Sequence, residues 1–136
     1  MHNISTDIYI LSETIQRASV IKTLIGDDVV TDSEITVIHK NEINPDSLPD
    51  SEAIFLVDLI SYRDASRKII SKLKTAAPNC KIIALHIYRT PLLIDPLFES
   101  GIDGYIHSDP SRKELLNAIE KVDNGEIYRP EIAKDS

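Results

Sequence analysis

The sequence predicts an α/β fold in which one five-stranded parallel sheet is covered by helices on both faces. Five apolar runs of strand length alternate along the chain with amphipathic or capped segments, although the second of these segments is weak. The third run, residues 53–60, is apolar apart from Asp58 near its C-terminal end, which is typical of a central strand buried on both faces. Such alternation favours parallel strands joined by right-handed crossovers.

Composition indicates one ordinary globular domain. The chain has 136 residues, of which 42% are hydrophobic and 27% charged. No apolar run reaches the roughly 18 residues that a membrane helix needs, and the N-terminus does not read as a secretory signal. The one cysteine, Cys80, cannot form an internal disulfide, so we expect a cytoplasmic protein. A net charge of −7 argues against an extended nucleic-acid surface.

The first strand and helix are predicted at residues 7–11 and 13–25. Ser12 is expected to cap the helix and Gly26 to end it. The apolar stripe of this helix is predicted to consist of Ile15, Ala18, Val20, Ile21, Leu24 and Ile25.

The middle of the chain holds two further strands and a second helix beside residues 53–60. Residues 35–39 are β-branched and short, and residues 81–85 form an apolar run, so both are predicted strands. Residues 41–51 are rich in Asn, Asp and Pro and leave room for at most one helical turn. The amphipathic pattern of residues 63–77 predicts a helix.

Two prolines make residues 87–94 ambiguous. Pro91 and Pro96 argue against one continuous helix in this region. Asp95 and Pro96 form a good N-cap and first-turn pair for a short helix that Gly101 closes.

The last strand and helix are predicted at residues 104–107 and 112–124. Ser111 and Glu114 have the spacing of a capping box, which opens the helix. The tail, residues 126–136, is mostly polar and is expected to fray.

Four short segments carry a family resemblance: Gly-Ile-Asp-Gly-Tyr-Ile-His-Ser-Asp at 101–109, Glu-Leu-Leu-Asn-Ala-Ile at 114–119, Asn-Gly-Glu-Ile-Tyr at 124–128 and Pro-Glu-Ile-Ala at 130–133. The chain resembles a response-regulator receiver domain, most closely the subfamily joined to a LuxR/NarL-type helix-turn-helix. The resemblance implies a flavodoxin-like fold with strand order 2-1-3-4-5. It also implies a receiver at residues 1–125 and a tail at 126–136 leading to a DNA-binding domain absent from this chain.

Receivers transfer a phosphoryl group to an aspartate that follows the third strand, and Asp58 occupies that place. From the residues alone, a functional carboxylate and a simple cap of the next turn were equal alternatives for Asp58. Receivers also use an acidic pair after strand one to hold Mg²⁺, a Ser/Thr after strand four and a Lys after strand five.

The resemblance places different residues at the other pocket positions. Ser12 and Glu13 match the acidic pair, so one carboxylate is lost and Glu13 with Asp58 should bind Mg²⁺ weakly or not at all. His86 replaces the Ser/Thr, where it either donates a hydrogen bond to an anion or, as we favour, obstructs phosphoryl entry. Ser108 replaces the Lys, which removes a fixed positive charge.

Two other residues, Tyr105 and His107, lie near the predicted pocket. Tyr105 falls on the aromatic switch position of receivers, and a plain interface tyrosine is the equal alternative. His107 should point to the opposite face from Ser108, as a packed surface histidine.

The favoured function is an atypical receiver of a two-component-type transcriptional regulator. It would act as a signalling and dimerisation module without ordinary Mg²⁺-dependent phosphorylation, and it would not be an enzyme. The alternative is a conventional receiver that a sensor histidine kinase phosphorylates on Asp58. An enzyme on a flavodoxin-like scaffold is disfavoured because no Gly-rich loop follows the first strand.

The expected partners follow from the resemblance. We expect a homodimer, formed through the first and last helices or through the face around Tyr105, with a sensor kinase or another protein as a further partner. DNA would be contacted only through the missing domain. We expect no cofactor, and Mg²⁺ only if phosphorylation is retained.

Overall fold

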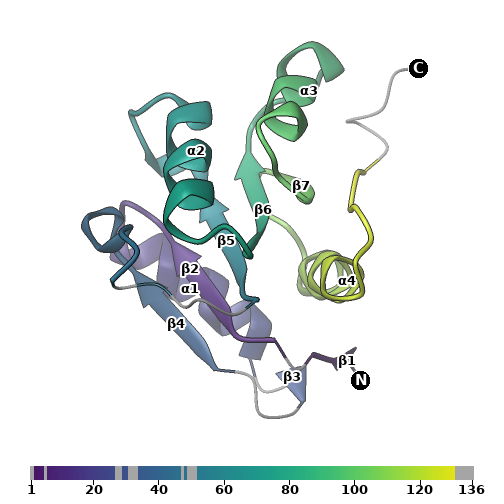
Figure 1. Cartoon of the computed structure of the whole chain (residues 1–136). Coiled ribbons are helices and arrows are strands. Elements are labelled where there is room, and N and C mark those ends of the chain that lie inside the picture. Colours follow the sequence, from purple (N-terminus) through teal and green to yellow (C-terminus); the bar gives the residue numbers. More distant parts are fainter. Residues whose placement is uncertain are drawn as a thin grey trace.

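The predicted parallel sheet is the centre of the structure. A computed structural model describes residues 2–4, 6–26, 29–30, 34–46, 48 and 52–130. Its main sheet has the order β4-β2-β5-β6-β7, all pairs parallel, which confirms the predicted order 2-1-3-4-5 (Figure 1). These strands are β2 (Ile8–Leu11), β4 (Ile35–Ile38), β5 (Ile54–Asp58), β6 (Lys81–His86) and β7 (Gly104–His107).

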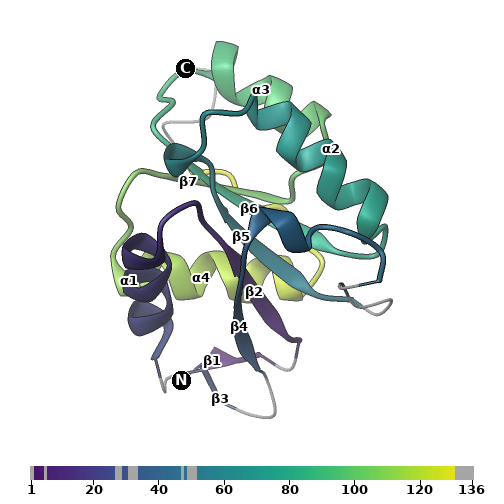
Figure 2. The ribbon, with the colours of Figure 1, turned by 90° about the vertical axis from the view of Figure 1, so that its left-hand side faces the viewer.

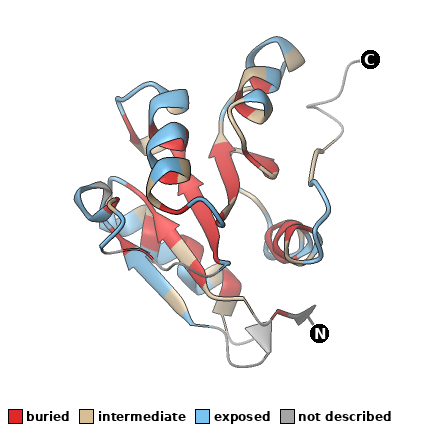
Figure 3. Cartoon of the chain, in the orientation of Figure 1, coloured by how far each residue is buried: buried red, intermediate tan, exposed pale blue. Residues whose placement is uncertain are grey.

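Two pairs of helices cover the two faces of this sheet. Helices α1 (Ile15–Ile25) and α4 (Arg112–Asp123) lie side by side on one face, and α2 (Ser66–Ala76) and α3 (Pro91–Glu99) lie on the other (Figures 1 and 2). Burial follows this layering, because the strands are mostly buried whereas the helices expose their outer sides (Figure 3).

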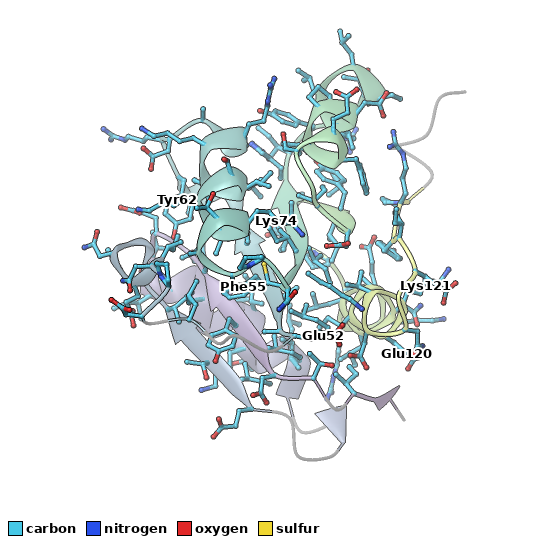
Figure 4. The ribbon with its side chains drawn as sticks, viewed as in Figure 1. Glu52, Phe55, Tyr62, Lys74, Glu120 and Lys121 are labelled. Atoms are coloured by element: carbon cyan, nitrogen blue, oxygen red, sulfur yellow. The ribbon has the colours of Figure 1, made fainter. Side chains whose placement is uncertain are left out.

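Strand β5 is buried along its whole length. Phe55 and Val57 pack into the core under α2 and α3, and Ile54 and Leu56 pack into the core under α1 and α4. Phe55 lies on the side of α2, whereas Glu120 lies on α4 (Figure 4). A strand with two apolar faces explains why the sequence pattern of residues 53–60 is nearly uninterrupted.

The boundaries of the third strand and second helix differ from the prediction. Strand β5 ends at Asp58, and a 3₁₀ turn, η3 (Leu59–Ser61), follows it. Helix α2 begins only at Ser66. The apolar run thus continues into a turn, which an apolar pattern alone does not distinguish from a strand.

Helix α1 begins two residues later than predicted, and its cap is Thr14 rather than Ser12. The side-chain oxygen of Thr14 accepts a hydrogen bond from the backbone N–H of Arg17 at 3.4 Å. The predicted apolar stripe is only partly buried, because Ile15 is 80% exposed and Val20 59% exposed.

Helix α3 is longer than the predicted short helix, and Asp95 is not its cap. Thr90 is the N-cap, with its Oγ1 accepting from the N–H of Leu92 at 3.3 Å, and Pro91 stands at the first helical position. Pro91 fits there because the missing N–H would have no partner inside the helix. The helix continues through Pro96, although a proline there has no N–H to donate to the carbonyl of Leu92, so the prediction that the two prolines argue against one continuous helix is wrong.

Three further short elements, β1, β3 and η2, lie in the described N-terminal half. Strands β1 (His2–Asn3) and β3 (Val29–Val30) form a parallel pair that the sequence pattern did not predict. The 3₁₀ turn η2 (Lys40–Glu42) is a single short helical turn. Among the described residues 40–46 and 48 this agrees with the prediction of at most one helical turn in the loop.

The first part of the tail packs against β7. The N–H of Tyr128 donates to the carbonyl of Asp103, and the carbonyl of Tyr128 accepts from the N–H of Tyr105, each at 3.0 Å. The hydroxyl of Tyr128 donates to Glu114 at 3.1 Å, and burial together with this carboxylate raises the pKa of Tyr128 to about 12. The prediction that the tail frays is therefore wrong as far as Tyr128, and residues 131–136 lie outside the described part.

Replacing Thr90 by alanine tests the start of α3. Thr90→Ala should lower the free energy of unfolding by about 1 kcal/mol, because the N–H of Leu92 loses its side-chain acceptor. Urea denaturation measures the effect. Thr75→Ala, at an exposed position of α2, is the matched control and should change stability by less than about 0.5 kcal/mol. Equal effects of the two substitutions would contradict the assignment of the cap.

Candidate functional site

The residues predicted to form the pocket meet at one edge of the sheet. Asp58 and His86 are the last residues of β5 and β6, and Ser12 follows β2. Ser108 follows β7, and its N–H donates to the carbonyl of His86 at 2.7 Å. Because all the strands run parallel, their carboxyl ends lie together, where open α/β sheets bind ligands.

Asp58 is fully buried and is held by a cation from the same chain. Its Oδ2 accepts from Nε of Arg17 at 2.6 Å, and its Oδ1 accepts from Nη2 of Arg17 at 3.2 Å. The hydroxyl of Ser12 donates to Oδ2 at 2.9 Å. Burial of a carboxylate is costly unless it is paired and hydrogen-bonded, and this two-pronged contact satisfies both requirements.

Arg17 reaches Asp58 from the first turn of α1. A cation in the first turn of a helix is unfavourable, because the N-terminal end of the helix dipole is positive. The carboxylate of Asp58 offsets this cost, and its hydrogen bond is the main reason that the pKa of Arg17 is raised. Our sequence interpretation missed Arg17; the usable signal was this unfavourable position one turn after Ser12 and Glu13.

Two serines fix the loop that follows β2. The hydroxyl of Ser61 donates to the backbone carbonyl of Asp58 at 2.8 Å and accepts from the N–H of Glu13 at 2.9 Å. Ser12 also accepts from the N–H of Thr14 at 3.3 Å. The Ser12 hydroxyl thus holds Asp58 and the entry to α1, a role different from the predicted N-cap.

The residues at this edge do not fit the Mg²⁺ ion that the resemblance implies. Both carboxylate oxygens of Asp58 accept hydrogen bonds from a guanidinium, which already neutralises the charge. Glu13 is exposed and contributes a backbone N–H to the network described above. Within the described residues, no group of three or more His, Cys, Asp or Glu is placed to hold a metal.

His86 stacks on a tyrosine beside the ion pair. Its ring lies 4.0 Å from that of Tyr88 with an angle of 20° between the planes, and its Nδ1 accepts from the N–H of Ile87 at 2.9 Å. Burial lowers the pKa of His86, and the charge of Asp58 acts in the opposite direction. Whether His86 obstructs an entering phosphoryl group stays a prediction.

Tyr105 lies inside the domain. Its side chain is 0% exposed, and its hydroxyl donates to the carbonyl of Tyr88 at 2.7 Å. Burial raises the pKa of Tyr105. The interpretation of Tyr105 as an interface residue is therefore wrong, and its role as a switch stays a prediction.

The residues around Ser108 complete the edge. Ser108 has a φ of 55°, which is uncommon for a residue other than glycine. His107, before it, is half-buried and accepts a hydrogen bond at Nε2 from Nε of Arg89 at 3.3 Å. The two neighbouring acids Asp27 and Asp28 lie outside the described residues.

The strand order, the helices on both faces and the aspartate at the end of the middle strand define a receiver-type α/β domain. The RcsB response regulator of Salmonella typhimurium matches 98% of this chain over 64% of its own, with 18% identity and a TM-score of 0.75. A LuxR-family two-component response regulator from Aurantimonas matches 95% of this chain and 94% of its own, with 19% identity and a TM-score of 0.75.

The isolated REC domain of Salmonella enterica RcsB is similar in the same way. It matches 94% of this chain over 95% of its own, with 16% identity and a TM-score of 0.76. These likenesses show the receiver fold. The chain spans about 64% of the length of the full RcsB chain. No family model and no curated protein matches the sequence.

Across the described parts of the chain, no helix combines the length and the apolar character that a membrane span requires.

A double-mutant cycle tests the ion pair. Arg17→Ala, Asp58→Asn and the double variant should give a coupling energy of about 1–3 kcal/mol, below the range for fully buried pairs because the Arg17 side chain is 34% exposed. Urea denaturation provides the free energies. A matched cycle on Lys74 and Asp103, whose charged atoms lie 3.9 Å apart near the surface, should give less than about 1 kcal/mol. Additive effects at Arg17 and Asp58 would rule out the pairing.

The pH dependence of stability tests the environment of His86. Because the pKa of His86 is lowered in the folded chain, the unfolded chain binds the proton more tightly. Above the unfolded-state pKa of about 6.5, the environment of His86 therefore costs the folded chain no stability. As the pH falls below that value, the free energy of unfolding decreases, because the unfolded chain takes up the proton first. Unfolding measured between about pH 7.5 and 5.5 should show a steeper loss for the wild-type chain than for His86→Gln. Parallel curves would contradict the assignment.

Proposed function

We propose that the chain is an atypical receiver module of a two-component-type transcriptional regulator, one that signals without ordinary Mg²⁺-dependent phosphorylation. The observation that carries the proposal is the two-pronged contact of Arg17 with the buried Asp58. In this arrangement the acceptor position is kept, but its carboxylate is bound within the chain. We call this arrangement the sealed site.

The chemistry of phosphoryl transfer supports the proposal. An attacking carboxylate needs an accessible oxygen, and the transferred group needs a metal ion and a fixed cation to neutralise its charge. Both oxygens of Asp58 face Arg17, and Ser108 stands where the resemblance expects a lysine. Moving Arg17 away would leave Asp58 buried with only the Ser12 hydroxyl, which is costly for a charged group.

The retained position of Asp58 favours a second function. A conventional receiver would be phosphorylated on Asp58 by a sensor histidine kinase, and Arg17 would then have to swing out of the site. Arg17 is partly exposed, so such a movement is sterically accessible, but it still requires an incoming cation to replace the guanidinium.

Exposed apolar side chains support a role in protein contacts. On α3, the consecutive residues Leu92 and Leu93 are 80% and 46% exposed, and on α1, Ile15 is 80% exposed. Large apolar side chains exposed in this way are candidates for contacts with another protein. We therefore include a homodimer, or a complex with another protein, in the proposal.

The wider architecture is proposed from the similar proteins. RcsB is described in connection with DNA interaction, and its chain extends beyond the part that this chain matches. We propose that residues 1–125 form the receiver, that residues 126–136 lead to a separate DNA-binding domain, and that the regulator acts in the cytoplasm without enzymatic activity.

A phosphorylation assay tests the proposal. The chain is incubated with acetyl phosphate and Mg²⁺, and its intact mass is followed, with a conventional receiver as the positive control. The expected result is no added phosphoryl group, because Arg17 occupies both oxygens of Asp58. A gain of one phosphoryl group that disappears in Asp58→Ala would establish the conventional function instead. Beryllofluoride binding, which needs the same metal, is the second readout.

A further inference from the structure

A hollow lies between α1 and the loop that follows β7, next to the sealed site. Its volume is ≈ 470 Å³, within the range of small-molecule sites. It is lined by Gln16, Arg17, Val20, Ile21, Leu24, Leu85, Asp109 and Pro110.

Most of this hollow is apolar. Ile21 and Leu85 belong to the buried core, with 4% and 1% exposure, so they form its floor. Val20 and Leu24 border it from α1, and Val20 is 59% exposed, an unusual position for a valine of the predicted apolar stripe. An apolar body bound here would cover this side chain and gain hydrophobic stabilisation.

One end of the hollow is cationic. Arg17 uses two of the five guanidinium N–H groups for Asp58, and the described residues provide no hydrogen bond to the others. The carboxylate of Asp109 approaches Nη2 of Arg17 only to 3.9 Å and is 87% exposed, so it interacts weakly. Arg17 can therefore donate hydrogen bonds to a second carboxylate in addition to Asp58.

We propose that this hollow binds a small amphiphilic carboxylate, whose head group pairs with Arg17 and whose apolar body lies along Val20 and Leu24. Arg17 and Leu24 are two helical turns apart, so the hollow extends about 10 Å along α1. That length suits a medium-chain fatty acid or an arylalkanoic acid. A single charged end and a short apolar wall fit such a molecule better than the extended surface of a second chain.

Binding would also regulate the sealed site. The head group binds the guanidinium in the orientation that holds Asp58, so the ligand favours this orientation over one in which Arg17 has moved away. This regulatory part rests on the proposed function, whereas binding itself does not.

Methyl NMR on the full chain tests the proposal, with octanoate as the probe. Octanoate should cause saturable shifts of the methyl signals of Val20, Leu24 and Leu85. Octylammonium has the same body with the opposite charge and should bind at least about ten-fold more weakly, because its head group faces Arg17. Octanol, which lacks a charge, should bind with intermediate affinity.

Three surface variants sharpen the test. Asp109→Asn should bind octanoate several-fold more tightly, because a competing carboxylate is removed. Val20→Asp places a carboxylate on the wall and should weaken binding at least about ten-fold. Thr23→Asp, at an exposed position of the same helix that does not line the hollow, is the matched control and should bind like the wild type.

Several results would overturn the proposal. These are the absence of saturable shifts with up to about 10 mM octanoate, equal affinity for octanoate and octylammonium, and equal shifts at the remote residues Ile87 and Leu92. Shifts at Val20 that depend on chain concentration and do not respond to octanoate would assign the hollow to a second copy instead. The acetyl phosphate assay is independent of this titration, so failure of the ligand site and failure of the proposed function are distinguishable.

Discussion

The buried negative charge of Asp58 is the constraint on which the arrangement of the sheet edge depends. A carboxylate with no exposed surface needs a counter-charge at hydrogen-bonding distance, and in this chain that charge is the guanidinium of Arg17. The contact also holds a cation at the unfavourable end of the α1 dipole. Each partner thus compensates the cost of placing the other, and together they join β5 to the start of α1.

The source of the positive charge decides what can control the site. A metal ion comes from solution, so a site that uses one responds to metal and to phosphodonors. A guanidinium belongs to the chain, and its charge is present at every physiological pH. A carboxylate neutralised in this way does not need a metal ion from solution to stay stable in its buried position.

Much of the fold could be predicted because the deciding signals are local. The uninterrupted run at residues 53–60 predicted a central strand, and parallel strands with crossovers allow few orders. The predicted starts of the helices were less accurate where more than one nearby residue could serve as the N-cap. Thr14 and Ser12 can both cap a helix, and Ser12 instead donates to a residue 46 positions away. Asp95 was predicted as a cap because Pro96 follows it and suits a first helical position, whereas α3 begins at Pro91 and is capped by Thr90.

The content of the site could be predicted only in part. The receiver resemblance placed Asp58, His86 and Ser108 in one pocket, and the structure brings them to one edge of the sheet. The contact that fills the site, from Arg17 to Asp58, spans 41 positions and depends on the reach of a long side chain. No periodicity encodes such a contact. The one usable clue was energetic, since a cation in the first turn of α1 requires a compensating charge.

Two anchored side chains, Arg17 and Tyr105, hold neighbouring elements together at this edge of the sheet. Arg17 ties α1 to β5, and Tyr105 ties β7 to the segment before α3 through the carbonyl of Tyr88. Tyr105 is fully buried and Asp58 is fully paired, so neither is free to respond directly to a molecule in solution. Arg17 is different, because it is partly exposed and lines the hollow on α1. An external signal that reaches Asp58 therefore has its most direct route through Arg17.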